Sequence, residues 1–245
     1  MEHALEISEL SVNYGKTAAL WDISLKIPKG VLVAIVGPNG AGKTTFLKAA
    51  LGLIPSLSGA VNYGGKSIAY VPQRETVDWD FPITVRELVL MGRYGKIGVF
   101  RFPKKSDWNA ADHYLEKVGL TAYASHQINQ LSGGQQQRAF IARALIQEAE
   151  ILFLDEPFVG IDEGSKQTIL ALFNDLRQMG KTLLVVHHDL ATVESIFNWV
   201  ILLNTRLIAS GPVENVFTKE QLALTFGKNY TLFDEALKLS KQTNV

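Results

Sequence analysis

The sequence predicts an α/β fold with an antiparallel β subdomain and an inserted helical subdomain. Short apolar runs, VLVAIV at 31–36 and ILFL at 151–154, are typical of buried strands. Residues 4–27 instead alternate apolar and polar side chains, which is typical of antiparallel strands. Between Arg74 and Gln130 the apolar residues follow helical spacing. These patterns predict strands in both ends of the chain, with a helical insertion between them.

The composition favours a folded protein without a nucleic-acid partner. The 245 residues, 47% of them hydrophobic, are enough for one large α/β domain or two small ones. The 24 basic and 24 acidic residues balance, so no overall field attracts nucleic acid or anionic lipid. The chain has no cysteine, and its five histidines lack a ligand spacing, so we expect no structural metal.

The chain carries no pattern for membrane insertion or secretion. No apolar run approaches the roughly 18 residues of a membrane span, and the N-terminal MEHALEISEL lacks the apolar core of a secretion signal. We therefore expect the chain to stay in the cytosol.

The N-terminal alternation predicts two strands, ALEISEL and LWDISLKI, joined by the turn NYGKTA. Tyr14 lies in this turn, upstream of a glycine-rich segment. It has two interpretations, an aromatic ring that stacks on a nucleotide base or a half-buried tyrosine at a strand end.

The segment VLVAIVGPNGAGKTT, residues 31–45, has the pattern of a phosphate-binding loop. Gly37, Gly42, Lys43 and Thr44 fit the spacing of glycine, four residues, glycine, lysine and serine or threonine. Glycines lack Cβ atoms, so backbone N–H groups can turn inward around a phosphate, and the next helix N-terminus adds partial positive charge. Lys43 would reach the β- and γ-phosphates, and the Thr44 hydroxyl would hold Mg²⁺. The alternative is a tight turn with a surface lysine.

Two short strands follow, in LSGAVNYGG and KSIAYVPQ, closed by glycine turns. Gln73 ends the second strand. A glutamine amide can contact a metal ion or an attacking water without adding charge, so its role depends on a Mg²⁺ site nearby.

Helical spacing in TVRELVLMGRY and SDWNAADHYLEKVGL, separated by the basic GKIGVFRFPKK, predicts the inserted subdomain. Its aromatic and apolar residues form either the core of this subdomain or an exposed docking surface for a partner helix. These residues are Phe81, Pro82, Met91, Tyr94, Phe100 and Phe102.

Two further motifs follow the insertion. LSGGQQQRAFIARAL predicts a helix preceded by a serine and glycines, which is either a second anion site or a plain helix cap. EILFLDEP predicts a central strand that ends in Asp155 and Glu156, at the edge where α/β sheets bind ligands. Asp155 fits a Mg²⁺ site through a water, and Glu156 fits the residue that orients and polarises the attacking water. Paired acids can also be only a solvated strand end.

The phosphate loop resembles that of the P-loop nucleoside triphosphatases, and LSGGQ, Leu131 to Gln135, resembles the signature of the ABC-type ATPases. The family's motifs occur in order over residues 1 to about 227, which implies a single ABC-type ATPase domain spanning residues 1–245. The implied parts are residues 1–73 and 150–227 as the nucleotide-binding core, 74–149 as the helical subdomain with the signature, and 228–245 as a C-terminal tail. We expect the end of this tail, KLSKQTNV, to be frayed.

The resemblance implies ATP and Mg²⁺ as cofactors. It assigns catalysis to Glu156, His188 and Gln73, and Mg²⁺ to Thr44, Gln73 and Asp155. The implied ATP-binding residues are Tyr14, Gly37, Pro38, Asn39, Gly40, Ala41, Gly42, Lys43, Thr44, Thr45, Ser132, Gly133, Gly134, Gln135 and Asp162.

Two histidines are adjacent, and the resemblance separates their roles. The family's switch histidine directly precedes an aspartate, so the role falls on His188, next to Asp189, which would hydrogen-bond the γ-phosphate. His187 stands where serine or threonine is commoner, and we interpret it as structural. Asp162 stands where the family makes a contact across a dimer.

One cassette without a fused membrane domain resembles the ATPase subunit of a prokaryotic importer. The segments VPQRETVDWDFPITVRELVLMGRYGKIGVF and DEPFVGID resemble the branch that takes up manganese, zinc or iron. Residues 78–82, DWDFP, carry this likeness and lie where the family docks a permease helix.

The resemblance implies integral membrane permease subunits and a second copy of the chain, in an ATP-sandwich dimer, as partners. An extracytoplasmic metal-binding protein would act indirectly, and the chain would sit peripherally on the cytoplasmic face of the inner (plasma) membrane. The alternatives are an ABC ATPase for another small solute, or a soluble ABC ATPase acting on an intracellular assembly.

Overall fold

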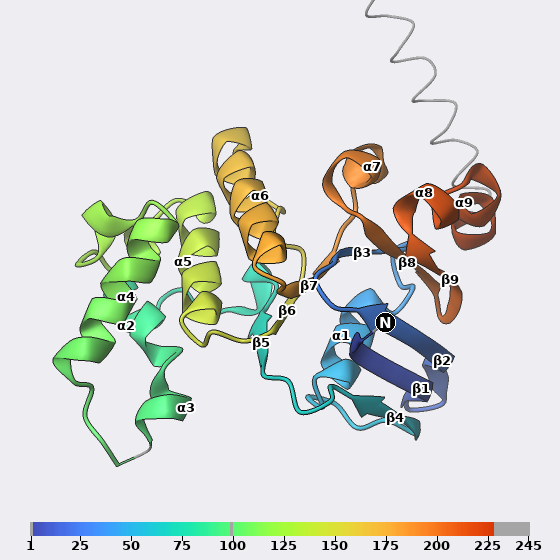
Figure 1. Cartoon of the computed structure of the whole chain (residues 1–245), viewed down its shortest axis with the longest axis horizontal. Coiled ribbons are helices and arrows are strands. Elements are labelled where there is room, and N and C mark those ends of the chain that lie inside the picture. Colours follow the sequence, from blue (N-terminus) through green and yellow to red (C-terminus); the bar gives the residue numbers. More distant parts are fainter. Residues whose placement is uncertain (1, 99, 228–245) are drawn as a thin grey trace, which may run out of the picture.

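The computed structural model describes residues 2–98 and 100–227, and their strands form two sheets (Figure 1). The strands are β1 (His3–Tyr14), β2 (Thr17–Pro28), β3 (Leu32–Val36), β4 (Ser58–Asn62), β5 (Ile68–Val71), β6 (Ile151–Leu154), β7 (Thr182–Val186), β8 (Trp199–Asn204) and β9 (Arg206–Pro212). The α-helices are α1 (Lys43–Ala50), α2 (Val85–Met91), α3 (Tyr94–Ile97), α4 (Lys105–Lys117), α5 (Gly133–Leu145), α6 (Glu163–Gln178), α7 (Val193–Ile196), α8 (Val213–Val216) and α9 (Lys219–Phe226). Short 3-10 helices span Arg74–Thr76, Thr121–Tyr123, Ile128–Gln130 and Leu190–Thr192.

The larger sheet has the strand order β5-β6-β7-β3-β8-β9. Neighbours from β5 to β8 run parallel, and β9 is antiparallel to β8. Every residue of β3, β6 and β7 is buried, which explains why these strands are unbroken apolar runs in the sequence. Parallel strands end at one edge of a sheet, so the loops that follow these three strands meet there.

The smaller sheet, with the order β2-β1-β4, confirms the predicted antiparallel subdomain. Its strand register pairs Tyr14 with Thr17, so the hairpin turn is shorter than the expected NYGKTA. Gly15 has a φ of 60° in this turn, a conformation that glycine adopts without steric cost. Buried residues of β1 and β2 share a hydrophobic cluster with α1 and one face of the larger sheet.

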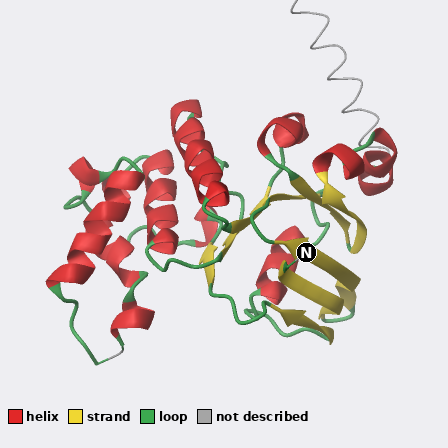
Figure 2. Ribbon diagram, in the orientation of Figure 1, coloured by secondary structure: helices red, strands yellow, loops and turns green. Residues whose placement is uncertain are grey.

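A helical lobe of α2, α3, α4 and α5 lies beside the strands, as the colouring of Figure 2 shows. Its buried residues Leu88, Leu115 and Ile141 belong to the same hydrophobic cluster as Leu32 and Leu152 of the larger sheet. Helix α5 contacts both β5 and α6. The predicted helical insertion is therefore present, and its core is continuous with that of the sheet. Where the subdomain begins and ends, at 74 and 149, stays a prediction.

Helix α6, which is 16 residues long, is an element that the sequence patterns did not assign. It begins after Asp162, whose Oδ1 accepts a hydrogen bond from Ser165 N at 2.8 Å. In the part of the chain that the structure describes, no helix is both long and apolar enough to span a membrane. The predicted tail, residues 228–245, lies outside the described residues.

Candidate nucleotide-binding site

The glycine-rich loop connects the end of β3 to the start of α1, as its sequence predicts. A Cβ atom at Gly37 would lie 2.0 Å from Leu203 O, and one at Gly42 would lie 2.6 Å from Ala19 O. Gly42 also has a φ of 92°, in the left-handed region. Both positions therefore require glycine, because any side chain would collide with neighbouring backbone or strain the turn.

Lys43 points back into this loop. Its Nζ donates hydrogen bonds to Gly37 O at 2.8 Å and Pro38 O at 2.9 Å, and the residue is 6% exposed. Burial lowers the pKa of Lys43, while the nearby Glu156 and Asp155 carboxylates act in the opposite direction. The loop thus holds the buried Lys43 amine against two backbone carbonyl oxygens. A bound phosphate could replace these oxygens as the charge-assisted hydrogen-bond partner of Lys43.

The loop after β6 brings two carboxylates to the same edge of the sheet. Thr44 Oγ1 donates to Asp155 Oδ1 at 3.1 Å. Glu156 Oε2 accepts a hydrogen bond from Gln73 Nε2 at 3.1 Å, and Glu156 Oε1 lies 2.6 Å from His188 Nε2. Side chains from four segments of the chain therefore converge at one point.

Glu156 has a left-handed backbone, with a φ of 54°. In a residue with a Cβ this conformation costs about 1–3 kcal/mol and is retained where surrounding contacts determine it. Here the two contacts of its carboxylate, with Gln73 and His188, fix the side chain between β5 and β7.

Asp155 has the features expected of a metal ligand. It is 1% exposed, and its Oδ2 has no hydrogen-bond partner among the described residues. Burial raises the pKa of Asp155, and the Thr44 hydrogen bond opposes this shift. A buried carboxylate oxygen beside the Thr44 hydroxyl supplies hard oxygen donors, which fit Mg²⁺, and the Gln73 side chain is held at the neighbouring Glu156. Nowhere in the described residues do three His, Cys, Asp or Glu side chains gather as a separate metal site.

The two adjacent histidines have different surroundings. His187 is 4% exposed, contacts Phe158 and Phe197 and pairs through Nε2 with Thr192 Oγ1 at 2.8 Å. Burial lowers its pKa to about 4, so it is neutral near pH 7. His188 is exposed and faces Glu156. This arrangement agrees with a structural role for His187 and leaves His188 as the histidine at the site.

A cavity of about 380 Å³ lies over the loop. Tyr14 is 57% exposed at the end of β1 and lines this cavity, where its ring is open to a bound base. The lining residues are Tyr14, Ala19, Asn39, Gly40, Ala41, Gly42, Lys43, Thr44, Thr45, Glu156 and His188.

A second, open cavity of about 620 Å³ adjoins the first at Asn39, Glu156 and His188. It is lined by Gly37, Pro38, Asn39, Gln73, Glu75, Glu156, His188 and Phe226. Sequence patterns did not select Ala19, Glu75 or Phe226. No local motif marks these three, because each reaches the site only through the tertiary fold.

The predicted signature residues lie elsewhere. Ser132 caps α5, where its Oγ accepts from Gln135 N and its own N donates to Gln135 Oε1. Gly134 packs so closely on the start of α6 that a Cβ there would lie 2.6 Å from Ser165 Oγ and 3.0 Å from Asp162 Oδ2. Neither cavity at the loop is lined by Ser132, Gly133, Gly134, Gln135 or Asp162. The predicted site residues therefore lie in two separate groups, one at the phosphate loop and one at the starts of α5 and α6.

Arg74 is a residue of this region that the sequence patterns missed. Its guanidinium bonds to Gln136 Oε1 on α5, and its carbonyl oxygen accepts from Trp79 Nε1 at 2.9 Å. The signal in the sequence that could have indicated Arg74 is its position directly after Gln73. The turn that places Gln73 at the site also directs Arg74 toward α5.

The fold and the site together define a P-loop ATP-binding protein. A family model described as "ABC transporter" matches residues 20–159. The manganese transport system ATP-binding protein MntB of Bacillus subtilis (strain 168) is 51% identical over 238 residues, which cover 94% of this chain and 95% of that protein. The zinc transport system ATP-binding protein TroB of Treponema pallidum (strain Nichols) is 49% identical, over 92% of this chain and 87% of that protein.

A solved structure agrees with this relationship. It is described as a metal-chelate type ABC transporter in an inward-facing conformation, and superposes with a TM-score of 0.84 at 32% identity. The alignment covers 92% of this chain and 89% of that one. The chain belongs to the ABC transporter family, as an ATP-binding subunit that hydrolyses ATP.

Proposed function

We propose that this chain powers the uptake of a transition metal ion, manganese, zinc or iron, through a separate membrane permease. The observation that carries the proposal is the convergence of Gln73, Glu156 and His188 beside the phosphate loop. The manganese and zinc transport systems to which the two relatives belong support the choice of cargo.

In this proposal, ATP binds with its phosphates in the loop and its adenine against Tyr14. Backbone N–H groups of residues 39–44 and the Lys43 ammonium hold the phosphates. Thr44, Gln73 and Asp155 would hold Mg²⁺, which supplies charge neutralisation on the phosphate oxygens when bound.

Glu156 orients and polarises the attacking water. One of its carboxylate oxygens accepts a hydrogen bond from Gln73, and the other faces His188. His188 donates to the γ-phosphate once ATP is bound, because it already lines both cavities at the loop. General-base assistance by Glu156 would raise the rate of ATP hydrolysis by about 10²- to 10⁴-fold.

The site is completed by a second copy of the chain. Within one chain, Ser132 and Gly134 do not line the cavity at the phosphate loop, which supports this proposal. The N-terminus of α5, which Ser132 caps, therefore remains available to the γ-phosphate of an ATP molecule bound to another chain. Asp162 lies against Gly134 at the start of α6, so it would support the signature at this interface.

The permease docks in an apolar groove of about 270 Å³ between the segment after Gln73, α2 and α5. The groove is lined by Val77, Asp78, Trp79, Phe81, Ile83, Leu88, Met91, Ile128 and Phe140. Phe81 is 57% exposed and Met91 40% exposed, which favours the docking interpretation of these residues over the core interpretation. The chain is thereby held on the cytoplasmic face of the inner (plasma) membrane, and an extracytoplasmic metal-binding protein acts only through the permease.

The test is metal accumulation in a strain that lacks this gene, compared across manganese, zinc and iron. We expect the wild-type gene to restore uptake of one of these ions and Lys43→Ala to fail, because a buried triphosphate loses its main charge-assisted donor. If the wild-type gene restored uptake of an unrelated solute instead, the proposal that the cargo is a transition metal ion would be wrong. Wild-type ATP affinity in Lys43→Ala would disprove the assignment of this loop.

A further inference from the structure

The connection between α3 and α4 carries an unusual surface. We call Phe100, Arg101, Phe102, Lys104 and Lys105 the tip, after their position at the outer end of the helical lobe. Phe100 is 98% exposed and Phe102 91% exposed. A side chain this apolar gains nothing from full exposure to water, and burying a phenylalanine is favourable by about ten-fold or more in an equilibrium constant. The two rings are therefore available to an apolar environment outside this chain.

The charged side chains of the tip itself, Arg101, Lys104 and Lys105, are all basic. Arg101, Lys104 and Lys105 make no ion pair with any residue that the structure describes, whereas other cations nearby are paired. Arg93 pairs with Asp107 at 2.8 Å, and Lys96 pairs with Glu148. The tip therefore holds local positive charge in a chain whose overall charge is zero.

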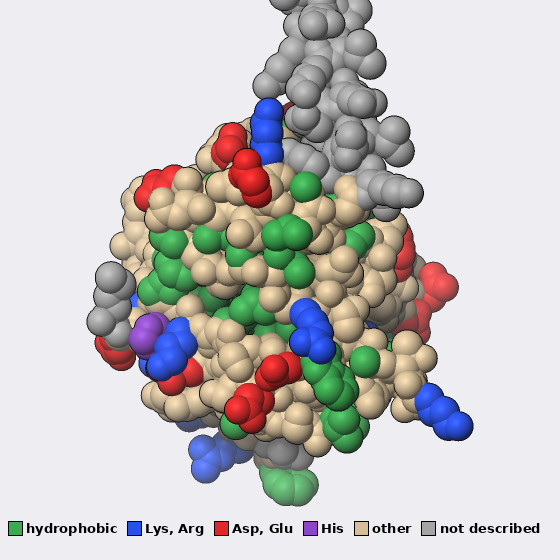
Figure 3. Space-filling view, turned by 90° about the vertical axis from the view of Figure 1, so that its right-hand side faces the viewer, with side chains coloured by type: hydrophobic (Ala, Val, Ile, Leu, Met, Phe, Trp, Pro, Cys, Tyr) green, Lys and Arg blue, Asp and Glu red, His purple; other side chains and the backbone are tan. Residues whose placement is uncertain are grey.

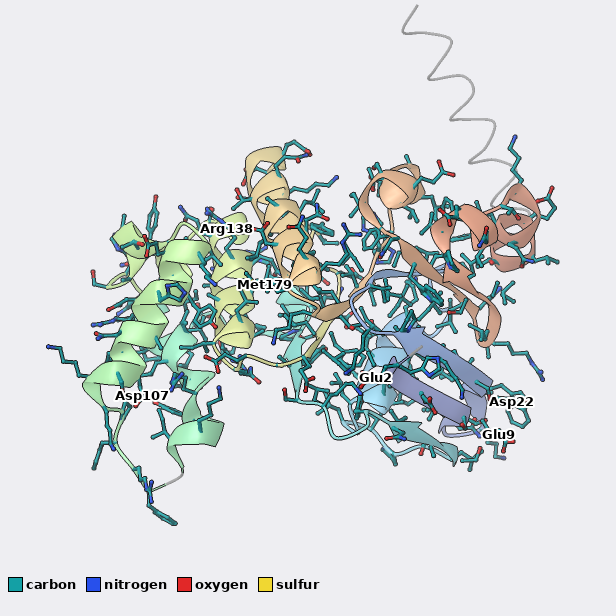
Figure 4. The ribbon with its side chains drawn as sticks, in the orientation of Figure 1. Glu2, Glu9, Asp22, Asp107, Arg138 and Met179 are labelled. Atoms are coloured by element: carbon teal, nitrogen blue, oxygen red, sulfur yellow. The ribbon has the colours of Figure 1, made fainter. Side chains whose placement is uncertain are left out.

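A small cavity of about 180 Å³ adjoins the tip and is lined in part by Phe102. Basic side chains dominate its lining, namely those of Arg93, Lys96, Arg101 and Lys104. The acidic residue in it, Asp107, is already occupied: it accepts from Arg93 Nε and from Lys104 N at 2.9 Å. These bonds fix the start of α4, at the edge of the lobe where Figure 4 labels Asp107. Arg101 and Lys104, which are in no ion pair among the described residues, are thus the cations that this cavity offers to an anion.

Exposed aromatic rings beside unpaired lysine and arginine are the combination that binds the interface of an anionic bilayer. Rings insert at the headgroup level, and the cations interact with lipid phosphates. The opposite end of the molecule differs, because Figure 3 shows acidic and basic side chains interspersed on it. Since the chain as a whole is neutral, any attraction to anionic lipid must come from a local group such as the tip.

We propose that the tip binds the surface of an anionic phospholipid bilayer, with Phe100 and Phe102 in the interface and Arg101, Lys104 and Lys105 on lipid phosphates. The tip continues from the docking groove along the chain, since Met91 lines the groove and Arg93 lines the basic cavity. This inference rests on the proposed function, because a subunit docked on a permease is held beside the bilayer. The tip adds a second, lipid contact to that docking.

The experiment is co-sedimentation of the full-length protein with vesicles of phosphatidylcholine alone or mixed equally with phosphatidylglycerol. We expect binding to the anionic vesicles and weak or no binding to the neutral ones, with a loss of binding as salt rises. Phe100→Ser/Phe102→Ser should lower the partition coefficient at least about ten-fold, since each ring loses its apolar contact. Arg101→Glu/Lys104→Glu should lower it similarly, and only this pair should flatten the salt dependence.

Matched controls keep the result specific. Leu53→Ser/Leu57→Ser removes two other apolar side chains, 59% and 64% exposed, and Lys117→Glu/Lys219→Glu reverses two other exposed cations. Both should bind vesicles as the wild type does. If the controls lose binding as much as the tip variants do, the attraction is general and the proposal is wrong.

Two further outcomes also overturn it. Equal binding of the wild type to neutral and anionic vesicles would show that the tip does not recognise anionic headgroups, which contradicts the proposal. If the wild type ignores vesicles while tip variants weaken co-purification with the permease in detergent, the tip contacts protein. ATP hydrolysis, measured in parallel, keeps the proposals separate: a wild type that hydrolyses no ATP contradicts the proposed function and leaves the vesicle result standing.

Discussion

The guanidinium of Arg74 donates to Gln136 Oε1 from two nitrogens, Nε at 3.1 Å and Nη2 at 2.9 Å. Gln136 is 4% exposed on α5, and its Nε2 donates to Ile128 O at 3.1 Å. Arg74 directly follows Gln73, which bonds to Glu156. One short segment therefore links Glu156, at the phosphate-loop edge of the sheet, to helix α5, which Ser132 caps.

Arg74→Ala should disturb the signature helix and leave ATP binding intact. It removes both donors from a buried acceptor, which costs about 1–3 kcal/mol, while Arg74 lines neither cavity at the phosphate loop. We expect kcat for ATP hydrolysis to fall and KM to stay within about two-fold. The reason is that the substitution changes the position of α5 and leaves the binding of ATP in the ground state unchanged. Arg74→Lys should restore only part of the rate, since lysine cannot supply the paired donors.

The same link offers a rescue experiment. Arg74→Gln/Gln136→Arg keeps a donor and an acceptor in contact with their positions exchanged, and should recover more activity than either single change. A double variant no better than the sum of its single changes would show that this contact has no role.

Stability should fall with acid through His187. Its folded pKa of about 4 lies below the unfolded value of 6.5, so the unfolded state binds the proton more readily. The free energy of unfolding therefore falls as the pH drops from 6.5 toward 4, by about 3 kcal/mol from this group. His187→Gln removes the titration, and urea unfolding at several pH values should show a flatter decline in the variant.

Asp155 acts in the opposite direction, because its folded pKa is raised and protonation stabilises the fold. Comparing wild type with His187→Gln cancels that contribution, since Asp155 is present in both. Parallel pH curves for the two proteins would rule out His187 as the buried neutral group.

Gly37→Ala should damage both fold and phosphate site. Its Cβ would lie 2.0 Å from Leu203 O, on a buried strand that cannot move freely. Overpacking of this kind costs about 1–3 kcal/mol. Gly95→Ala is the matched control, because nothing lies within 4 Å of its Cβ position and its φ is not in the left-handed range. Equal unfolding midpoints for the two variants would contradict the close approach.

Met91→Asp should uncouple hydrolysis from transport. Met91 lines the apolar groove and is 40% exposed, so a carboxylate there is tolerated by the fold and excluded from an apolar contact with the permease. ATP hydrolysis by the isolated subunit should remain within a few-fold while permease association is lost. Thermal stability is the control: a parallel loss of stability and hydrolysis would make Met91 a core residue. Arg93 is unsuitable for this test, because it pairs with Asp107.

Much of the site could be predicted because its signals are local. The spacing around Gly37 and Lys43 identifies a strand, a loop and a helix in one stretch of sequence, and Asp155 ends an apolar strand of the same sheet. The structure places Thr44 Oγ1, at the start of α1, at 3.1 Å from Asp155 Oδ1, because the loops after the parallel strands β3 and β6 meet at one edge of the sheet.

Contacts between distant segments gave no such signal. Phe226 reaches the second cavity only because α9 packs on β8 and β9, and nothing in its neighbourhood of the sequence marks it. The sequence patterns do not predict helix α6, although Asp162 before it is a typical N-cap residue. The exposure of Phe81 and Phe100 also needed the structure, since composition alone cannot separate core from surface aromatics.

The completion of one ATP site by two copies of the chain is tested most directly with Glu156→Gln. Glu156→Gln keeps size and hydrogen bonding but removes the carboxylate, so ATP should bind and persist. Because a bound ligand stabilises whichever state holds it, light scattering should detect a dimer with ATP and Mg²⁺ and none with ADP. Adding Ser132→Arg should abolish this dimer, whereas adding Ser56→Arg, on an exposed loop, should not. A Glu156→Gln protein that stays monomeric at saturating ATP, or that hydrolyses ATP at the wild-type rate, would contradict the account.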